Sequence, residues 1–144
     1  MDTARLRDRI LRGQFDEGLE LTANAPLDDL RDALVGLAFE TESLACYAFC
    51  VAMAERDGAR GHGLASDVLA TSSLCRLPGA YQAAFFHAKR AVKLAPSDVG
   101  YREFLLFFHG HPEQVLSRDE AVAIARDLLE LDPDNEAARR LLAE

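Results

Sequence analysis

The chain has 144 residues, 49% of them apolar, which is enough to bury a hydrophobic core and favours one folded domain over a disordered chain. Its formal net charge of −8 argues against nucleic acid as a partner, because phosphates would be repelled, and makes a basic protein or peptide electrostatically plausible. A long apolar run and a secretory signal are both missing, and the three cysteines have no framework spacing, so we expect a cytoplasmic protein without disulfides or a membrane partner.

Apolar residues recur at helical spacing along almost the whole chain, and no segment shows the alternation of a strand. Residues 1–58 are predicted to form divergent helical hairpins, whose apolar stripes are marked by Leu6, Ile10, Phe15, Leu19, Leu27, Leu30, Leu34 and Leu37. Gly13 and the Asn-Ala-Pro segment at 24–26 separate the first helices. The strongly apolar segment 42–58 is the fourth predicted helix, and we expect it to be the most buried.

Two further hairpins and a C-terminal capping helix are predicted in the second half of the chain, over residues 59–98, 99–135 and 136–144. Residues 57–63 are interpreted as a turn or a helix start, and the apolar stripe that follows predicts one continuous helix over 64–77. The expected fold class is all-α, with about nine helices in a single domain over residues 1–144.

Two helix endings of the same kind occur 37 residues apart, VKLAPSD at 92–98 and LELDPDN at 129–135. The residues that carry the pattern are Gly79, Tyr81, Ala84, Ala91, Leu94 and Pro96 in the first copy, and Glu120, Ala121, Leu131, Asp132, Pro133, Asp134 and Asn135 in the second. Glycine permits a tight turn, alanine lets two helices approach closely, and proline ends the second helix. This pattern resembles the tetratricopeptide repeat (TPR), a helix–turn–helix unit of about 34 residues. Ser117 and Glu120 are also expected to form a capping box.

The resemblance implies antiparallel helical hairpins that stack as a short, right-handed, TPR-like superhelix. The longer spacing places an insertion of about three residues between Phe107 and Ser117. Val68 and Leu105 stand where a TPR has a large aromatic residue or leucine early in the first helix. An irregular all-α stack that contains two TPR-like hairpins is the alternative architecture.

In the TPR family, the first helices of successive hairpins line a concave groove that binds an extended peptide or a partner helix. Here these helices are 64–77 and 101–110, and the resemblance implies partner contacts at Ser66, Leu69, Ser73, Arg76, Glu103, Phe104 and Phe107. The carboxylate clamp known in this family is not expected, because its positions are occupied by residues that offer no cationic cradle, namely Ser66, Ala70, Glu103 and Phe107.

The aromatic segment 101–110 allows two interpretations. Helical spacing places Phe104 and Phe108 on one face and Phe107 about 60° or more away from it. The rings then either fill core contacts on both sides of a middle helix or form an exposed anchor pocket for a partner.

Few residues suggest catalysis or metal binding. Cys46 and Cys50 lie one helical turn apart in an apolar segment, which is typical of packing thiols rather than metal ligands. A zinc site in a loop could be built from His109 and His111 with His62 or His87. The sequence has no nucleophile elbow, no phosphate-binding glycine loop and no HExxH motif.

The expected function is therefore a non-catalytic protein–protein interaction module, with no cofactor, that binds a protein or peptide partner through a helical groove. One alternative is an immunity or antitoxin-like inhibitor that covers a basic toxin, since the chain is acidic. The other is a small metal-binding protein or enzyme that uses the loop histidines.

Overall fold

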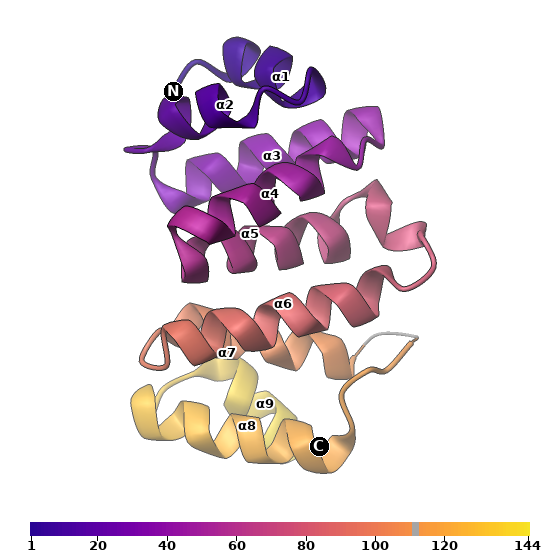
Figure 1. The fold of residues 1–144 in the computed structure, drawn as a ribbon. Coiled ribbons are helices and arrows are strands. Elements are labelled where there is room, and N and C mark those ends of the chain that lie inside the picture. The colour runs from indigo at the N-terminus through magenta and orange to yellow at the C-terminus, as the bar shows by residue number, and fades with distance from the viewer. Residues whose placement is uncertain (111–112) are drawn as a thin grey trace.

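The computed structural model describes residues 1–110 and 113–144 of the chain. All regular structure in this part of the chain is helical, with nine α-helices and two short 3-10 helices, which confirms the all-α fold class. Their bounds are α1 Thr3–Leu11, α2 Phe15–Thr22, α3 Leu27–Thr41, α4 Ala45–Arg56, α5 Gly58–Thr71, η1 Ser73–Arg76, α6 Ala80–Leu94, α7 Val99–Leu105, η2 Leu106–His109, α8 Arg118–Leu131 and α9 Glu136–Ala143. The helices follow one another along the molecule, from α1 and α2 at one end to α8 and α9 at the other (Figure 1). No helix within the described residues combines the length and the apolar content that crossing a bilayer requires.

Several helices begin where the sequence supplies a side-chain cap. The carboxylates of Asp2 and Asp98 accept hydrogen bonds from backbone N–H groups in the first turns of α1 and α7, and the Asn135 side chain does the same for α9. At α8 the predicted capping box is confirmed. The Ser117 hydroxyl accepts a hydrogen bond from the Glu120 backbone N–H at 3.3 Å, and the Glu120 carboxylate accepts one from the Ser117 backbone N–H at 3.0 Å.

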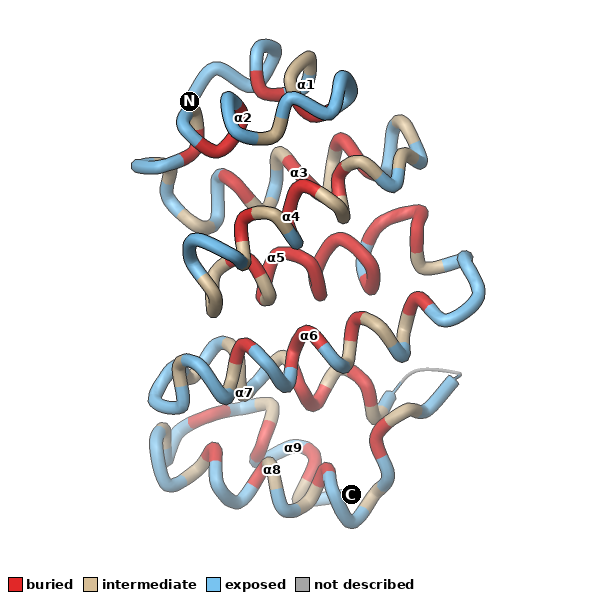
Figure 2. Tube along the Cα trace, in the orientation of Figure 1, coloured by how far each residue is buried: buried red, intermediate tan, exposed pale blue. Residues whose placement is uncertain are grey.

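Helix α5 is the most buried helix in the described part of the chain (Figure 2). The prediction that segment 42–58 would be the most buried is therefore wrong, although α4 within it does face the core. Almost every residue from Gly61 to Ala70 is buried, because α5 packs against α3, α4 and α6. A helix with neighbours on several sides buries nearly its whole circumference, which the spacing of apolar residues alone does not reveal. Residues 57–63, interpreted as a turn or a helix start, form the beginning of α5 from Gly58 onward.

Small residues let α5 approach its neighbours closely. A Cβ atom at Gly61 would lie 2.2 Å from the backbone nitrogen of Ala54 in α4, so only glycine fits there. On the other side, the Ser66 hydroxyl donates a 2.7 Å hydrogen bond to the backbone carbonyl of Ala84 in α6, and Ala84 itself is fully buried. Helices α4, α5 and α6 therefore form a closely packed central block.

Two predicted helices are shorter than their apolar stripes suggest. Helix α5 ends before Ser72, whose hydroxyl donates to the Val68 carbonyl and accepts a hydrogen bond from the Leu74 backbone N–H. Residues 64–77 therefore contain the end of α5 followed by η1, and residues 101–110 contain α7 followed by η2. In each case an α-helix passes into a turn of 3-10 helix instead of continuing.

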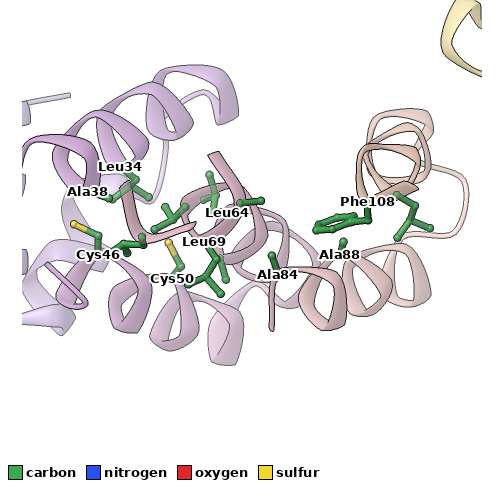
Figure 3. Packing of buried hydrophobic residues seen from close by; sticks show 14 of the residues in the cluster. Leu34, Ala38, Cys46, Cys50, Leu64, Leu69, Ala84, Ala88 and Phe108 are labelled. Carbon is green, nitrogen blue, oxygen red and sulfur yellow. The ribbon is translucent and has the colours of Figure 1, made fainter. Parts of the chain in front are cut away.

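The hydrophobic core is one cluster that extends from Leu6 in α1 to Leu141 in α9. Figure 3 shows its middle part, where the side chains of Cys46 and Cys50 lie among other buried apolar groups. Both cysteines are 0% exposed, and burial raises the pKa of the Cys46 thiol to about 11. The interpretation of these two residues as packing thiols is confirmed.

Candidate partner-binding groove

A groove of about 680 Å³ lies between the alternate helices α3, α5, α7 and α9, with further contributions from α6 and η2. Its volume is within the range of roughly 300–1,000 Å³ that is usual for ligand pockets. The expected groove-lining helices α5 and α7 are thus joined by helices from the first half and from the end of the chain. The groove brings together residues that are far apart in the sequence.

Small residues keep part of this groove open and allow one close contact across it. Ala88 and Ala91 of α6 contribute little volume to the lining. A Cβ atom at Gly63 would lie 2.6 Å from Cε1 of Tyr101, so glycine leaves room for the tyrosine ring against α5. Burial, reinforced by the carboxylate of Asp98, raises the pKa of Tyr101, so its phenol stays neutral and can donate a hydrogen bond.

An ion pair links α3 to α5 within the groove. Nε of Arg31 lies 2.7 Å from Oδ2 of Asp67, and Nη1 of Arg31 lies 2.7 Å from Oδ1 of Asp28. The Asp67 side chain is only 12% exposed, and burial raises its pKa although the hydrogen bond and the charge of Arg31 oppose that change. The positive charge of Arg31 is therefore matched by two carboxylates.

An aromatic surface forms one wall of the groove. The rings of Phe104 and Phe107 are half-buried and stacked, with centroids 5.3 Å apart and planes inclined by 16°. Phe108 is fully buried and meets both rings edge-on. The sequence placed Phe107 about 60° or more off a face shared by Phe104 and Phe108, but in the structure Phe104 and Phe107 share the groove face. The chain passes into a 3-10 helix at Leu106, and residues three apart then align. Phe108 serves as core, while the other two rings face the groove.

Carboxylates outnumber cationic groups along the described lining. The acidic residues are Asp28, Asp67, Asp98, Glu103 and Glu144, and the arginines are Arg31 and Arg140. Glu103 accepts a 2.6 Å hydrogen bond from the amide of Asn135, and Asp98 caps α7, but within the described residues neither carboxylate has an ion-pair partner. Glu144 pairs at 3.1 Å with Arg118, which does not line the groove. The groove therefore carries an excess of negative charge.

The residues predicted to contact a partner divide into two groups in the structure. Glu103, Phe104 and Phe107 line the groove together. The other four residues do not line it. Ser66 and Leu69 are buried in α5, and Ser73 is buried with its hydroxyl 3.0 Å from the Phe39 carbonyl. Arg76 is exposed, and its guanidinium lies 3.4 Å from the Glu42 carboxylate. The cause is that α5 turns most of its surface to neighbouring helices and that Ser73 and Arg76 belong to η1.

Sequence reasoning missed several groove residues that come from other helices. Arg31 and Asp67 were among them, although Asp67 lies in the middle of an otherwise apolar segment. A charged residue in such a place needs a partner, and this signal could have pointed to a buried ion pair. Nothing local in the sequence indicates that its partner is 36 residues away.

Two of the histidines considered as metal ligands contact each other on the central block. Nδ1 of His62 in α5 lies 2.9 Å from Nδ1 of His87 in α6, and Nε2 of His87 lies 2.8 Å from the hydroxyl of Tyr47 in α4. Burial, with a smaller contribution from His62, lowers the pKa of His87 to about 4, and burial together with Arg90 lowers that of His62. Both rings are therefore neutral near pH 7, with one nitrogen of the close pair donating and the other accepting.

The loop histidines are placed differently. His109 lines the groove, and its Nδ1 lies 3.3 Å from the Leu116 carbonyl, which is a hydrogen bond within the fold. His111 lies outside the described residues. Over residues 1–110 and 113–144, no group of three or more histidine, cysteine, aspartate or glutamate side chains is arranged to hold a metal ion.

No family model, curated protein or solved structure matches this chain. The resemblance to TPR proteins therefore rests on the residues quoted above.

Proposed function

We propose that this chain is a non-catalytic interaction module of the cytoplasm that binds a segment of a partner protein in the groove between α3, α5, α7 and α9. The observation that carries the proposal is the stacked pair Phe104 and Phe107, half-buried on the wall of a 680 Å³ groove beside the carboxylate of Glu103. Aromatic anchors in a concave site, with polar groups at their side, are typical of surfaces that recognise protein segments. The TPR resemblance implies the same mode of binding.

The chemistry of the groove supports binding over catalysis. The described lining has no serine, threonine, cysteine or lysine to act as a nucleophile, and three of its five carboxylates, those of Asp28, Asp67 and Glu144, are held in ion pairs. The Arg31–Asp67 pair is committed to joining two helices, and His109 is bonded to the backbone. The remaining carboxylates and rings are suited to holding a ligand.

A second candidate function is inhibition of a basic toxin by an immunity or antitoxin-like complex. It is favoured by the excess of carboxylates along the groove and by the net charge of −8. An inhibitor of this kind forms a tight, stoichiometric complex with one protein, whereas a general interaction module binds several partners more weakly. The number of partners and their affinities therefore separate the two functions.

Site-specific photocrosslinking tests the proposed function. A benzophenone side chain is placed at position 107 in the groove, and in a control protein at position 130, an exposed site on α8 that does not line it. Partners captured only from position 107 are purified, and their affinities are measured for the original protein, for Phe107→Ala and for Phe39→Ala, which removes an exposed ring outside the groove. We expect Phe107→Ala alone to weaken binding. Equal affinity for both variants, with the fold of each intact by circular dichroism, would refute binding through the groove.

A further inference from the structure

We infer that the partner segment carries a lysine or arginine side chain next to a large apolar side chain, and that the groove binds both side chains together. The inference rests on the proposed function and specifies the chemistry of its ligand. Three features of the groove lead to it. Two carboxylates have no ion-pair partner within the described residues, the stacked rings are only half-buried, and these groups lie next to each other on α7 and η2.

The charges of the groove leave two carboxylates available to a ligand. The charge of Arg31 is already met by Asp28 and Asp67, and Glu144 is paired with Arg118. Arg140, the other arginine of the described lining, holds no ion pair there, so its one charge stands against the two carboxylates of Glu103 and Asp98. Glu103 and Asp98 receive hydrogen bonds from an amide and from a backbone N–H, which orient them without neutralising their charge. A cationic group that enters the groove would therefore find oriented negative charge.

The apolar part of the site lies beside these carboxylates. Glu103 and Phe104 are adjacent in the chain and both face the groove, and Phe107 stacks on Phe104. A lysine or arginine side chain has an apolar stem and a charged end, so the stem can lie on the rings while the end reaches Glu103. A neighbouring leucine or phenylalanine of the ligand can pack beside Leu27 and Ala137, two lining residues that are only half-buried.

Other occupants fit this surface less well. A second copy of the chain brings another net charge of −8, and nucleic acid or a phosphorylated peptide brings phosphates, so each would meet electrostatic repulsion in the groove. An uncharged apolar segment would satisfy the rings and leave Glu103 partly desolvated without a partner, which has a cost. The basic and apolar segment is the occupant that satisfies both parts of the site.

Selection from a random library of displayed 12-residue peptides tests the inference, because such a library offers the groove many combinations of charged and apolar side chains. The full chain is the bait, and peptides are kept if they bind it and fail to bind Phe107→Ala. We expect the selected peptides to be enriched in lysine or arginine next to leucine, phenylalanine or another large apolar residue. The selected peptides are then synthesised, and so are variants in which each basic residue is changed to glutamine. The affinity of the protein for each peptide is measured.

The charge contribution is measured with a matched pair of double variants. Glu103→Gln with Asp98→Asn removes two groove carboxylates, and asparagine still caps α7. Glu130→Gln with Asp127→Asn removes the same charge from exposed positions of α8 outside the groove. We expect the groove variant to weaken binding of a selected peptide roughly tenfold or more, and the α8 variant to weaken it less than about twofold.

The outcomes separate the two proposals. Selected peptides that depend on Phe107 but carry no excess of basic residues, or that bind both double variants equally, would overturn this inference and leave the proposed function standing. A library that yields no peptide dependent on Phe107 would overturn both.

Discussion

Two helical glycines offer a matched pair of substitutions whose effects on stability should have opposite signs. Gly61 lies in α5 and Gly36 in α3, and alanine is favoured over glycine inside a helix by about 1 kcal/mol. At Gly36 an added Cβ meets no atom within 4 Å, so Gly36→Ala should stabilise the fold by about 0.5–1 kcal/mol. The same methyl group at Gly61 meets the backbone of the adjacent helix.

The magnitude at Gly61 follows from that contact. The new Cβ would lie 2.2 Å from the nitrogen and 2.4 Å from the Cα of Ala54, where ordinary contacts begin near 3.4 Å. Backbone atoms cannot turn aside as a side chain can, so α4 and α5 must separate along a closely packed interface. Overpacking costs about 1–3 kcal/mol, and a forced backbone shift belongs at the upper end of that range. After subtraction of the helix-propensity gain, Gly61→Ala should destabilise the fold by about 2 kcal/mol.

Urea denaturation followed by far-ultraviolet circular dichroism measures both variants against the original protein. The expected result is a lower midpoint for Gly61→Ala and a slightly higher one for Gly36→Ala, with similar slopes. If Gly61→Ala proved as stable as the original protein or more stable, the close approach of α4 and α5 would be refuted.

Three further predictions concern the stability of the fold. Ala84→Leu should destabilise it by about 1–3 kcal/mol, because Ala84 is fully buried against α5, whereas leucine at the exposed Ala123 should have little effect in the same urea titration. Ser117→Ala should cost about 1 kcal/mol through the lost cap of α8, and Ser117→Thr, which keeps the hydroxyl, should restore most of it. Thermal unfolding compares the two variants, and equal losses would argue against a capping role. Because burial lowers the pKa of His87 to about 4, the unfolded chain binds a proton near pH 6.5 that the folded chain does not bind. Stability should therefore fall as the pH drops from about 6.5 towards 4, by at most about 1.4 kcal/mol per pH unit for this group. His87→Phe should flatten that fall between about pH 6.5 and 5, and an unchanged slope in urea midpoints would contradict the assignment.

The helices themselves could be predicted from local features of the sequence. The stripe Leu30, Leu34 and Leu37 marks the buried face of α3, and Ser117 with Glu120 marks the start of α8, because spacing and capping act over a few residues. The ends of α5 and α7 were less predictable, since apolar residues continue past both points and only tertiary packing distinguishes a 3-10 turn from another α-helical turn.

The groove could be predicted only in part, because periodicity identifies an apolar face but not the number of neighbours that cover it. Glu103 and Phe107 were found because α7 and η2 have one side free to face the groove. Ser66 lies on a helix with the same periodic pattern, yet that helix, α5, packs between other helices. The Ser66 hydroxyl therefore donates a hydrogen bond to α6 and does not face the groove. The contributions of Arg31 and Arg140 depend on how distant helices pack, and no local pattern encodes that arrangement.

The close contacts within the α4–α5–α6 block determine how the groove can change shape. Gly61 brings two helix backbones into contact, and Ser66 bonds α5 to the main chain of α6, so these three helices cannot slide past one another without breaking their packing. Helix α3 is joined to the block partly through the Arg31–Asp67 pair, and α7 partly through the ring of Tyr101. The part of the groove formed by α5 and α6 is therefore fixed by the packing of this block, whereas α3 and α7 make fewer contacts with the block than its helices make with one another.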